Sequence, residues 1–351
     1  ELIAPVVFLR PLGLRLVSLG NLAGHVAQVG AMGVISTAHP GYKEDDFESN
    51  HRQANIRALK KEILKAQKLS QGKGLVAINA MVALKDYEEL INAALESKVD
   101  AIISGAGLPL RLPELVKDHD VLIAPIVSSG KACKVIIKHW LKKYQRTPDF
   151  IVIEGSQAGG HLGFKKEQIQ DQHYALEALI PEVVMIASSY KEQKQIPVIA
   201  AGGISTGEDI AHFMELGASG VQMGSIFVTT LECDASETFK EVYIHSKSED
   251  VLIIESPVGM PGRAIDGEFI HNVNNGLERP KSCSFHCIKT CDYTKSPYCI
   301  IKALYNAARG NMKKGYAFAG SNAFLAEKIS SVKEVMATLE REFFLATHRL
   351  A

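Results

Sequence analysis

The chain has 351 residues, enough to bury a large core, and its 39 basic and 39 acidic side chains give a formal net charge of zero. A chain without an excess of positive charge is a poor candidate for a nucleic-acid-binding protein. No apolar run approaches the roughly 18 to 20 residues that cross a bilayer, and the first residues lack the pattern of a signal peptide. We therefore expect a cytoplasmic protein with no membrane and no nucleic-acid partner.

Short apolar runs alternate with longer amphipathic stretches, which is the pattern of repeated βα units. We expect strands within 5–17 and at 32–36, 75–79, 100–104, 121–126, 150–153, 196–201 and 220–223. Helices are expected at 19–29, 50–69, 86–97, 129–144 and 206–216. Eight parallel strands with intervening helices predict an α/β fold, a (β/α)8 TIM barrel, and an open doubly wound sheet is the alternative.

The remaining chain is expected to cover the barrel. We predict a barrel over residues 1–230, a covering segment over 231–330 and a C-terminal helix within 331–351. A helix at 300–308 and a glycine loop at 315–322 are expected in the covering segment, with the loop folded over the barrel mouth. The last helix, 332–344, carries apolar residues at helical spacing and is expected to pack on the barrel or on a second subunit.

The loop after the sixth strand has the composition of an active site. Four glycines occur within nine residues, at 155, 159, 160 and 163, and Glu154 and His161 stand among them. Glycines allow positive φ and close approach by another molecule, while the imidazole can exchange protons near neutral pH. The alternative is a tight strand-to-helix connection in which His161 only forms a local hydrogen bond.

Small and polar residues follow several other strands, and in a barrel the carboxyl ends of strands carry the chemistry. Asn79 ends the third strand and Ser128 follows the fifth. Gly202 and Gly203 follow the seventh strand, and Gly224 and Ser225 the eighth. The last two strands are the usual place for a phosphate in this fold, because glycines expose backbone N–H groups there. Ordinary turn formation is the alternative.

Several motifs in one order resemble the nitronate monooxygenases, once called 2-nitropropane dioxygenases, a family that also includes flavin-containing enoyl-ACP reductases. The motifs are 158–161 (AGGH), 201–204 (AGGI), 217–224 (GA followed by VQMG) and 256–263 (SPVGMPGR). The resemblance covers residues 5–331 and implies a TIM barrel that holds FMN non-covalently at its mouth.

The resemblance also implies roles for individual residues. Those expected to bind FMN are Asn79, Ser128, Glu154, Gly160, Gly202, Gly203, Gly224 and Ser225. The last four would hold the phosphate, and Asn79, Ser128 and Glu154 would lie near the ribityl chain or the ring. His161 would face the substrate as the catalytic residue.

The first strand departs from the family. A glycine-rich sequence usually follows that strand, whereas residues 9–18 here contain one glycine and two arginines, Arg10 and Arg15. Either the arginines reach an anionic group or the site binds FMN less tightly. We assign no residue of this segment to the cofactor.

Four cysteines, Cys283, Cys287, Cys291 and Cys299, follow a C-x3-C-x3-C-x7-C spacing. On a helix the first three would share one face, and four thiolates could hold zinc or an iron–sulfur cluster. The spacing matches neither paired C-x2-C motifs nor the common ferredoxin sequence. We therefore predict no metal and favour free thiols that pack in the covering segment.

The predicted function is an FMN-dependent oxidoreductase, a monooxygenase (dioxygenase in the older name) that oxidises alkyl nitronates with dioxygen. An NAD(P)H-dependent FMN enoyl-ACP reductase is the first alternative, and a non-catalytic barrel that binds a phosphorylated ligand is the second. The expected partners are a small-molecule substrate, a nitronate or an enoyl thioester, with NAD(P)H and a homodimer left open.

Overall fold

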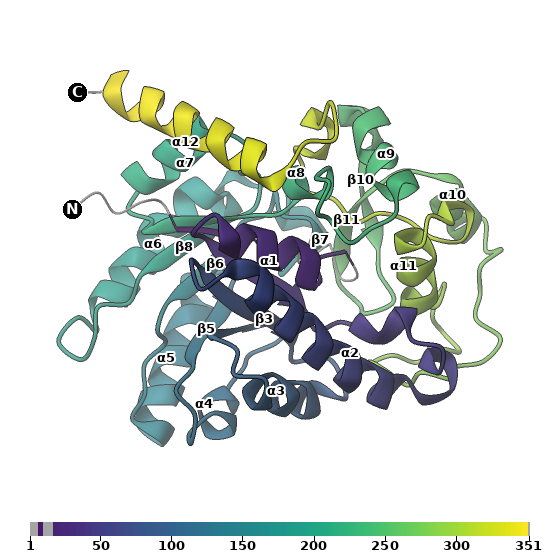
Figure 1. The fold of residues 1–351 in the computed structure, drawn as a ribbon, viewed down its shortest axis with the longest axis horizontal. Coiled ribbons are helices and arrows are strands. Elements are labelled where there is room, and N and C mark those ends of the chain that lie inside the picture. The colour runs from purple at the N-terminus through teal and green to yellow at the C-terminus, as the bar shows by residue number, and fades with distance from the viewer. Residues whose placement is uncertain (1–5, 10–16, 350–351) are drawn as a thin grey trace.

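A computed structural model describes residues 6–9 and 17–349 of the chain, and its central feature is a closed barrel of eight parallel strands (Figure 1). The strands follow the order β1-β2-β3-β4-β5-β6-β8-β9. They are β1 (Val6–Leu9), β2 (Met32–Ser36), β3 (Leu75–Met81), β4 (Ala101–Gly105), β5 (Leu122–Val127), β6 (Ile151–Glu154), β8 (Val198–Ala201) and β9 (Gly220–Met223). The predicted TIM barrel is confirmed, and the doubly wound alternative is wrong.

Helices surround the barrel and follow the strands in sequence. They are α1 (Gly20–Gln28), α2 (Phe47–Ser70), α3 (Tyr87–Glu96), α4 (Leu112–Leu115), α5 (Gly130–Tyr144), α6 (Leu176–Ser188) and α7 (Gly207–Glu215). The sequence predicted all of these except α4, which has a single turn, and α6. Pro181 lies inside α6, and a proline in a helical pattern obscures the periodicity by which a helix is recognised.

The barrel interior is filled by one inward-facing set of side chains. Because side chains alternate along a strand, every second residue points inward. This buried set consists of Met32, Val34, Ala77, Ala101, Ile103, Ala124, Phe150, Val152, Ile199 and Ala201. Four of the ten are alanines. A separate and larger apolar core packs between the barrel and the helices. A residue at the carboxyl end of a strand that continues this inward-facing row therefore points into the barrel mouth.

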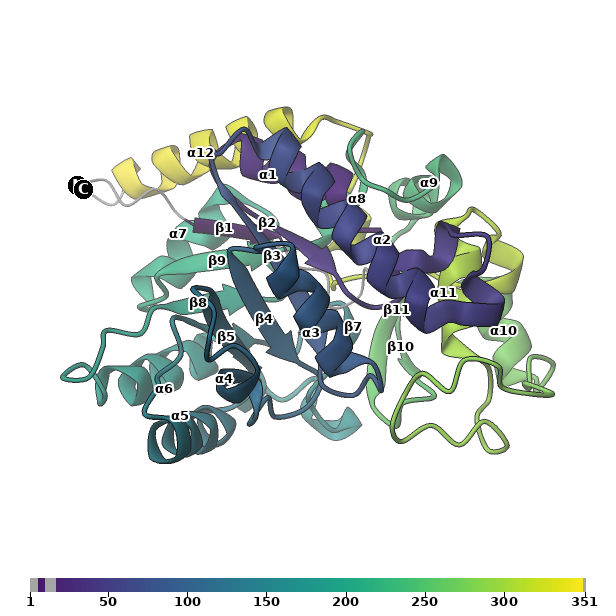
Figure 2. The same cartoon turned by 60° about the horizontal axis from the view of Figure 1, so that its bottom comes forward.

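The chain after β9 builds a cover at the carboxyl end of the barrel, where Figures 1 and 2 show its elements gathered together. These elements are α8 (Ser225–Val228), α9 (Glu237–His245), β10 (Val251–Glu255), β11 (Pro261–Ile265), α10 (Glu268–Asn274) and α11 (Ile300–Ala308). A two-residue strand from the glycine loop, β7 (Gly160–His161), joins a three-stranded sheet of order β10-β11-β7. The loop after β6 is thus tied to the cover by backbone pairing. The division at residues 230 and 330 stays a proposal.

The remaining elements complete the surface. Short 3-10 helices lie at Pro40–Lys43, Lys166–Gln168, Gln172–Tyr174, Ser248–Asp250, Met312–Lys314 and Ala323–Leu325. The last helix, α12 (Val332–Arg349), lies beside α7 in Figure 1, and the Gly207 amide donates a 2.9 Å hydrogen bond to Glu342 Oε2. The expected packing of this helix on the barrel is confirmed. Over the described residues, no helix is both long and apolar enough to cross a bilayer.

Candidate active site

Three polar side chains occupy the inward register at the mouth of the barrel. Asn79 lies two residues after Ala77 and Glu154 two residues after Val152, so both continue the inward-facing rows of their strands. Gln222 pairs with the inward Ala201 in the β8–β9 register. All three are at least 95% buried. They form a polar layer above the apolar interior.

Two of these side chains have a buried atom that lacks a partner. Asn79 Oδ1 and Gln222 Oε1 accept no hydrogen bond from any residue that the structure describes. A buried amide oxygen without a donor costs about 1–3 kcal/mol. Native structures rarely tolerate this, and a bound molecule that supplies N–H or O–H groups is a usual explanation.

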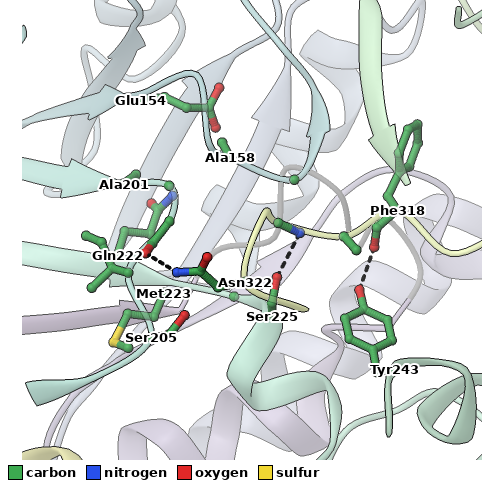
Figure 3. Close-up of a pocket in the computed structure, with 17 residues that line it drawn as sticks. Glu154, Ala158, Ala201, Ser205, Gln222, Met223, Ser225, Tyr243, Phe318 and Asn322 are labelled. Carbon is green, nitrogen blue, oxygen red and sulfur yellow. Dashed lines mark hydrogen bonds between the residues drawn. The ribbon is translucent and has the colours of Figure 1, made fainter. Parts of the chain in front are cut away.

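A pocket lies above Gln222 and Glu154, and we call it the glycine pocket (Figure 3). The barrel contributes the ends of β6, β8 and β9, and the cover contributes the opposite wall. Its barrel residues include Glu154, Ala158, Gly159, Gly202, Gly203, Ser205, Gln222, Gly224 and Ser225, and its cover residues are Tyr243, Phe318, Ala319, Gly320 and Asn322. Among these lining residues there is no lysine or arginine.

The glycines of this pocket are required by its geometry. Gly202 has φ +103° and Gly203 has φ +76°, a region that strains other residues. A Cβ on Gly202 would lie 2.9 Å from the backbone nitrogen of Ala158. The absence of side chains here keeps the backbone of two loops in close contact and leaves space beside it for a ligand.

Hydrogen bonds join the cover to the glycine loops. Asn322 Nδ2 donates to the Gly203 carbonyl at 2.7 Å, and the Gly320 amide donates to Ser225 Oγ at 2.9 Å. The Tyr243 hydroxyl donates to the Phe318 carbonyl at 2.5 Å. The three bonds are drawn in Figure 3. The segment around residues 316–322 therefore forms the outer wall of the pocket, as the sequence predicted for its glycine loop.

Arg263 of β11 binds the backbone of the loop that follows β6. Its Nη1 donates to the carbonyls of Ser156 and Ala158, at 2.8 and 2.7 Å. Burial lowers the pKa of Arg263 to about 10, so the guanidinium remains charged at neutral pH. Because Ala158 lines the glycine pocket, this buried positive charge lies directly behind its wall.

A second pocket has Glu154 in its lining in common with the first. We call it the histidine pocket, because His161 lines it together with Ser128, Gly163 and Met260. The rest of its lining is mostly aliphatic: Met81, Ala106, Gly107, Leu108, Ile126, Val127 and Ala132. A polar pocket and an apolar pocket thus meet at one carboxylate.

The His161 ring is held by groups from the cover. His161 Nε2 lies 2.5 Å from Ser256 Oγ, within hydrogen-bond distance, and the Phe318 ring makes an edge contact with the imidazole at a centroid distance of 5.0 Å. His161 also pairs with Gly262 in the β7–β11 ladder. His161 is 97% buried. Backbone, hydroxyl and aromatic contacts together fix its place in the histidine pocket.

The structure brings most of the predicted site residues together. Glu154, Gly202, Gly203, Gly224 and Ser225 line the glycine pocket, and Ser128, Glu154 and His161 line the histidine pocket. Asn79 lines neither and lies in the polar layer, while Gly160 precedes His161 in β7. Their roles toward a cofactor stay predictions. Arg10 and Arg15 lie outside the described residues.

Sequence reasoning missed five residues of the site: Gln222, Tyr243, Ser256, Arg263 and Asn322. Gln222 could have been found as the polar residue inside an apolar strand, by counting its register. Ser256 and Arg263 belong to a motif that had been noticed without a role. Asn322 ends the glycine loop that the sequence predicted over the barrel mouth, although no role had been given to it. No local signal marks Tyr243, which lies on α9 and is held at the pocket by its bond to the Phe318 carbonyl.

The cysteine cluster does not form the helical face considered above. Residues 275–299 contain no helix or strand, and the four thiols are free and half-buried. Burial and the three neighbouring cysteines raise the pKa of Cys287 to about 12, so its thiol is neutral. Within the described part of the chain, no group of histidine, cysteine, aspartate and glutamate side chains has an arrangement that could hold a metal ion.

Comparison with known proteins places this site in a family. A family model described as nitronate monooxygenase matches residues 1–342. The chain belongs to the nitronate monooxygenase family. The resemblance seen in the motifs is thereby confirmed.

Curated relatives carry the same description. A protein of Staphylococcus saprophyticus described as "Probable nitronate monooxygenase" is 31% identical over 198 residues, which are 55% of this chain and 52% of the relative. A protein of Staphylococcus aureus with that description is 39% identical over 127 residues, 36% of this chain and 34% of the relative. The chain spans about half the length, or less, of these relatives.

Solved structures share the fold over nearly the whole chain. FabK from Thermotoga maritima is 22% identical with a TM-score of 0.72, covering 99% of this chain and 94% of that one. A nitroalkane oxidase from Streptomyces ansochromogenes is 17% identical with a TM-score of 0.72, covering 98% of this chain and 97% of the other. At these identities the likeness shows a common fold.

Proposed function

We propose that the chain is an FMN-dependent oxidoreductase that oxidises alkyl nitronates with dioxygen. One observation carries the proposal: Glu154 lines both the polar glycine pocket and the mostly apolar histidine pocket, so a cofactor held in the first would present one end to a substrate in the second. Membership of the nitronate monooxygenase family supports the reaction class.

The residues present fit a flavin mononucleotide. Gln222 Oε1, in the lining of the glycine pocket, needs a donor, and a flavin has a ring N–H and ribityl hydroxyls that could supply one. The glycines at 202, 203 and 224 leave backbone exposed at the two strands where this fold usually holds a phosphate. Bound flavin would accept two electrons from the substrate and pass them to dioxygen.

The charge of the glycine pocket favours a phosphate held mainly by backbone groups. Its lining has no basic side chain among the described residues, so oriented N–H groups would provide most of the neutralisation. Arg263 adds a positive charge behind the loop. Glu154 would repel a phosphate, and its position between the two pockets instead suits the ring end of the cofactor.

His161 would act on the substrate in the histidine pocket. A nitronate is an anion with two oxygens that accept hydrogen bonds, and an imidazole N–H can donate to one of them or hold a proton during the reaction. Ser256 fixes the ring plane through Nε2, and the burial of His161 excludes bulk water from it. The chain's own contribution is therefore orientation, desolvation and control of one proton.

The test begins with the absorption spectrum of the purified protein, followed by anaerobic addition of a nitronate and, separately, of NADPH. We expect flavin bands that bleach with the nitronate and persist with NADPH. His161→Ala should lose turnover and keep the bands, whereas His173→Ala, on an exposed histidine, should change neither. A colourless protein that takes up no FMN would contradict the proposal and favour the non-catalytic barrel.

An NAD(P)H-dependent enoyl-ACP reductase is the second candidate. The mostly aliphatic lining of the histidine pocket suits an acyl group as well as an alkyl group, and the fold is shared with FabK. His161 would then serve as proton donor to the substrate carbon. Rapid bleaching of the flavin by NADPH without oxygen, together with no reaction with a nitronate, would select this candidate.

A further inference from the structure

The outward face of α5 carries a row of lysines, and we call this row the lysine stripe. The 15 residues of α5 include no aspartate or glutamate. Exposed lysines recur along the helix at 131, 134, 138 and 142, and these four form the stripe. Residues three or four apart lie on one face of a helix, so the four side chains project together into solvent. The stripe is about 16 Å long, at 1.5 Å per residue.

The stripe differs from the other basic helix, α2, in its ion pairs. Most basic side chains of α2 have an acidic partner, namely Arg52, Arg57, Lys60, Lys61 and Lys65 with Glu89, Asp46, Glu96, Glu44 and Asp234. Within the described part of the chain, no lysine of the stripe forms a salt bridge. Two carboxylates that contact α5 bind other groups: Glu182 accepts from the Gly130 amide, and Glu114 from the Tyr144 hydroxyl. The stripe is therefore a local excess of positive charge in a chain whose net charge is zero.

The stripe begins at the edge of the histidine pocket. Ser128 and Ala132, which flank Lys131 in sequence, both line that pocket. Trp140 Nε1 donates at 3.1 Å to the carbonyl of the residue after Leu108, which ties α5 to a loop that also lines the pocket. Leu108 is 45% exposed, so the pocket wall reaches the surface beside this helix. Figures 1 and 2 show α5 at the periphery of the barrel.

The composition of this face indicates the chemistry of its partner. The exposed residues of α5 are lysines and Val135, which is 42% exposed and lies between Lys131 and Lys138 on the same face. One aliphatic side chain among positive charges is complementary to a helix that carries carboxylates around a single apolar residue. Nucleic-acid sites add aromatic side chains or arginine, and membrane-binding helices add large apolar residues. The exposed face of α5 has neither, so an acidic protein helix fits it best.

We propose that the outward face of α5 binds an acidic helix of a partner protein, which places that partner beside the exposed wall of the histidine pocket. The proposal concerns the surface of α5 and does not depend on which reaction the site catalyses. Carboxylates of the partner pair with the lysine stripe, and its apolar residue contacts Val135. Because salt screens exposed charges, the affinity falls as ionic strength rises.

The test is fluorescence anisotropy of the purified protein with a labelled helical peptide whose glutamates recur at i, i+3, i+7 and i+11 around one leucine. Replacing the four lysines of the stripe by glutamine should weaken binding at least tenfold. The matched control removes the same charge from α2, by glutamine at Lys60, Lys61, Lys65 and Lys68, and should change the affinity less than threefold. Far-ultraviolet circular dichroism checks that both variants are folded. Equal losses in the two variants would overturn the proposal.

Val135→Lys separates a docked helix from diffuse attraction. The variant adds a positive charge, so attraction without docking would tighten binding, whereas contact of the helix with Val135 predicts weaker binding. Tighter binding by Val135→Lys would overturn the proposal, as would equal affinity for a peptide of the same composition with glutamates on all sides. Single-stranded RNA or anionic phospholipid vesicles that bind more tightly than the peptide, and only with the stripe intact, would also overturn it. Dimerisation that is lost in the stripe variant would identify a second copy as the occupant and overturn it as well.

Discussion

At the scale of single residues, the site depends on glycines whose role is steric. Gly202 combines φ +103° with a Cβ position that lies 2.9 Å from the backbone of Ala158. A backbone neighbour cannot rotate away as the end of a flexible side chain can. The two loops that line the glycine pocket would have to separate to accept even a methyl group.

We predict that Gly202→Ala weakens flavin binding at least tenfold, because it displaces one wall of the glycine pocket. Gly276→Ala is the matched control, since Gly276 has φ +74° but no atom within 4 Å of its Cβ position. The control should lose about 1 kcal/mol of stability from backbone strain and bind flavin normally. Fluorescence titration of the flavin-free proteins measures both effects, and equal losses in the two variants would contradict the steric explanation.

Ser256 is a positioning residue for His161, since its Oγ lies 2.5 Å from Nε2. We predict that Ser256→Ala lowers kcat about tenfold, the equivalent of about 1.4 kcal/mol, because the imidazole loses one of the contacts that orient it. Ser256→Thr retains the hydroxyl and should restore most of the rate.

Kinetics over the pH range in which imidazole titrates distinguish positioning from simple packing. A positioning role predicts that Ser256→Ala changes the pH profile of kcat and that Ser256→Thr does not. Identical profiles in all three proteins, or equal rate losses in both variants, would be evidence that the serine only fills space.

At the scale of elements, β11 is the structural centre of the cover. It pairs with β10 on one side and β7 on the other, and the segment around Phe318 pairs with Ala264. Through these pairs one strand holds the loop that carries His161 and the segment that closes the glycine pocket. The cover thus organises the site as well as enclosing it.

We predict that Arg263→Met destabilises the protein by about 3 kcal/mol or more, because two buried carbonyls lose a charged donor, at about 1.5–3 kcal/mol for each hydrogen bond. Arg263→Lys should be intermediate, since an ammonium cannot reproduce the guanidinium geometry. Urea unfolding measures the change.

The control is Arg52→Met, which removes an exposed ion pair with Glu89 and should lower the free energy of unfolding by less than about 1 kcal/mol. If Arg263→Met lowers the free energy of unfolding no more than this control does, the two hydrogen bonds from Arg263 contribute little to stability.

At the scale of the whole molecule, the barrel could be predicted from sequence because each strand carries its own signal. The expected strand at 32–36 matches β2, and the run at 220–223 matches β9. The same local patterns marked Glu154, Gly202 and Ser225, since the residue after a parallel strand reaches the mouth whatever follows it.

The cover could not be predicted in this way. β7 has two residues, too few for any periodicity, and forms because β11, about 100 residues later, pairs with it. Tyr243 and Asn322 line the glycine pocket through hydrogen bonds between segments far apart in sequence, from Tyr243 to the Phe318 carbonyl and from Asn322 to the Gly203 carbonyl. The cysteine segment contains no helix, so the shared helical face considered for it does not form. The segment instead docks on the loop after β3, where the Lys85 amide donates to the Cys287 carbonyl.

The stability of the whole molecule should depend on pH through Asp149, which lies between α5 and β6. Burial alone would raise the pKa of Asp149, but hydrogen bonds from Lys194, the Ile123 amide and Arg146 outweigh it and hold the pKa below 3.8. The pKa of Asp149 is lower in the folded protein than the ordinary value of 3.8 that it has in the unfolded chain. Its contribution to the free energy of unfolding is therefore complete above pH 3.8 and is lost as the pH falls through the pKa of the folded state.

We predict that Asp149→Asn destabilises the protein by about 2 kcal/mol at neutral pH, the order of a hydrogen bond to a charged group, and that this difference shrinks as pH falls below 3.8. Asp118→Asn, at an exposed carboxylate, is the control and should change stability little at any pH. Urea unfolding followed from neutral to acid pH measures both variants. If the free energies of unfolding of Asp149→Asn and of the unmodified protein differ by the same amount at every pH, the side chain acts through packing and neutral hydrogen bonds. A difference that closes in acid would locate one source of acid sensitivity at the junction of β5, β6 and α5, opposite the end of the barrel that carries the site.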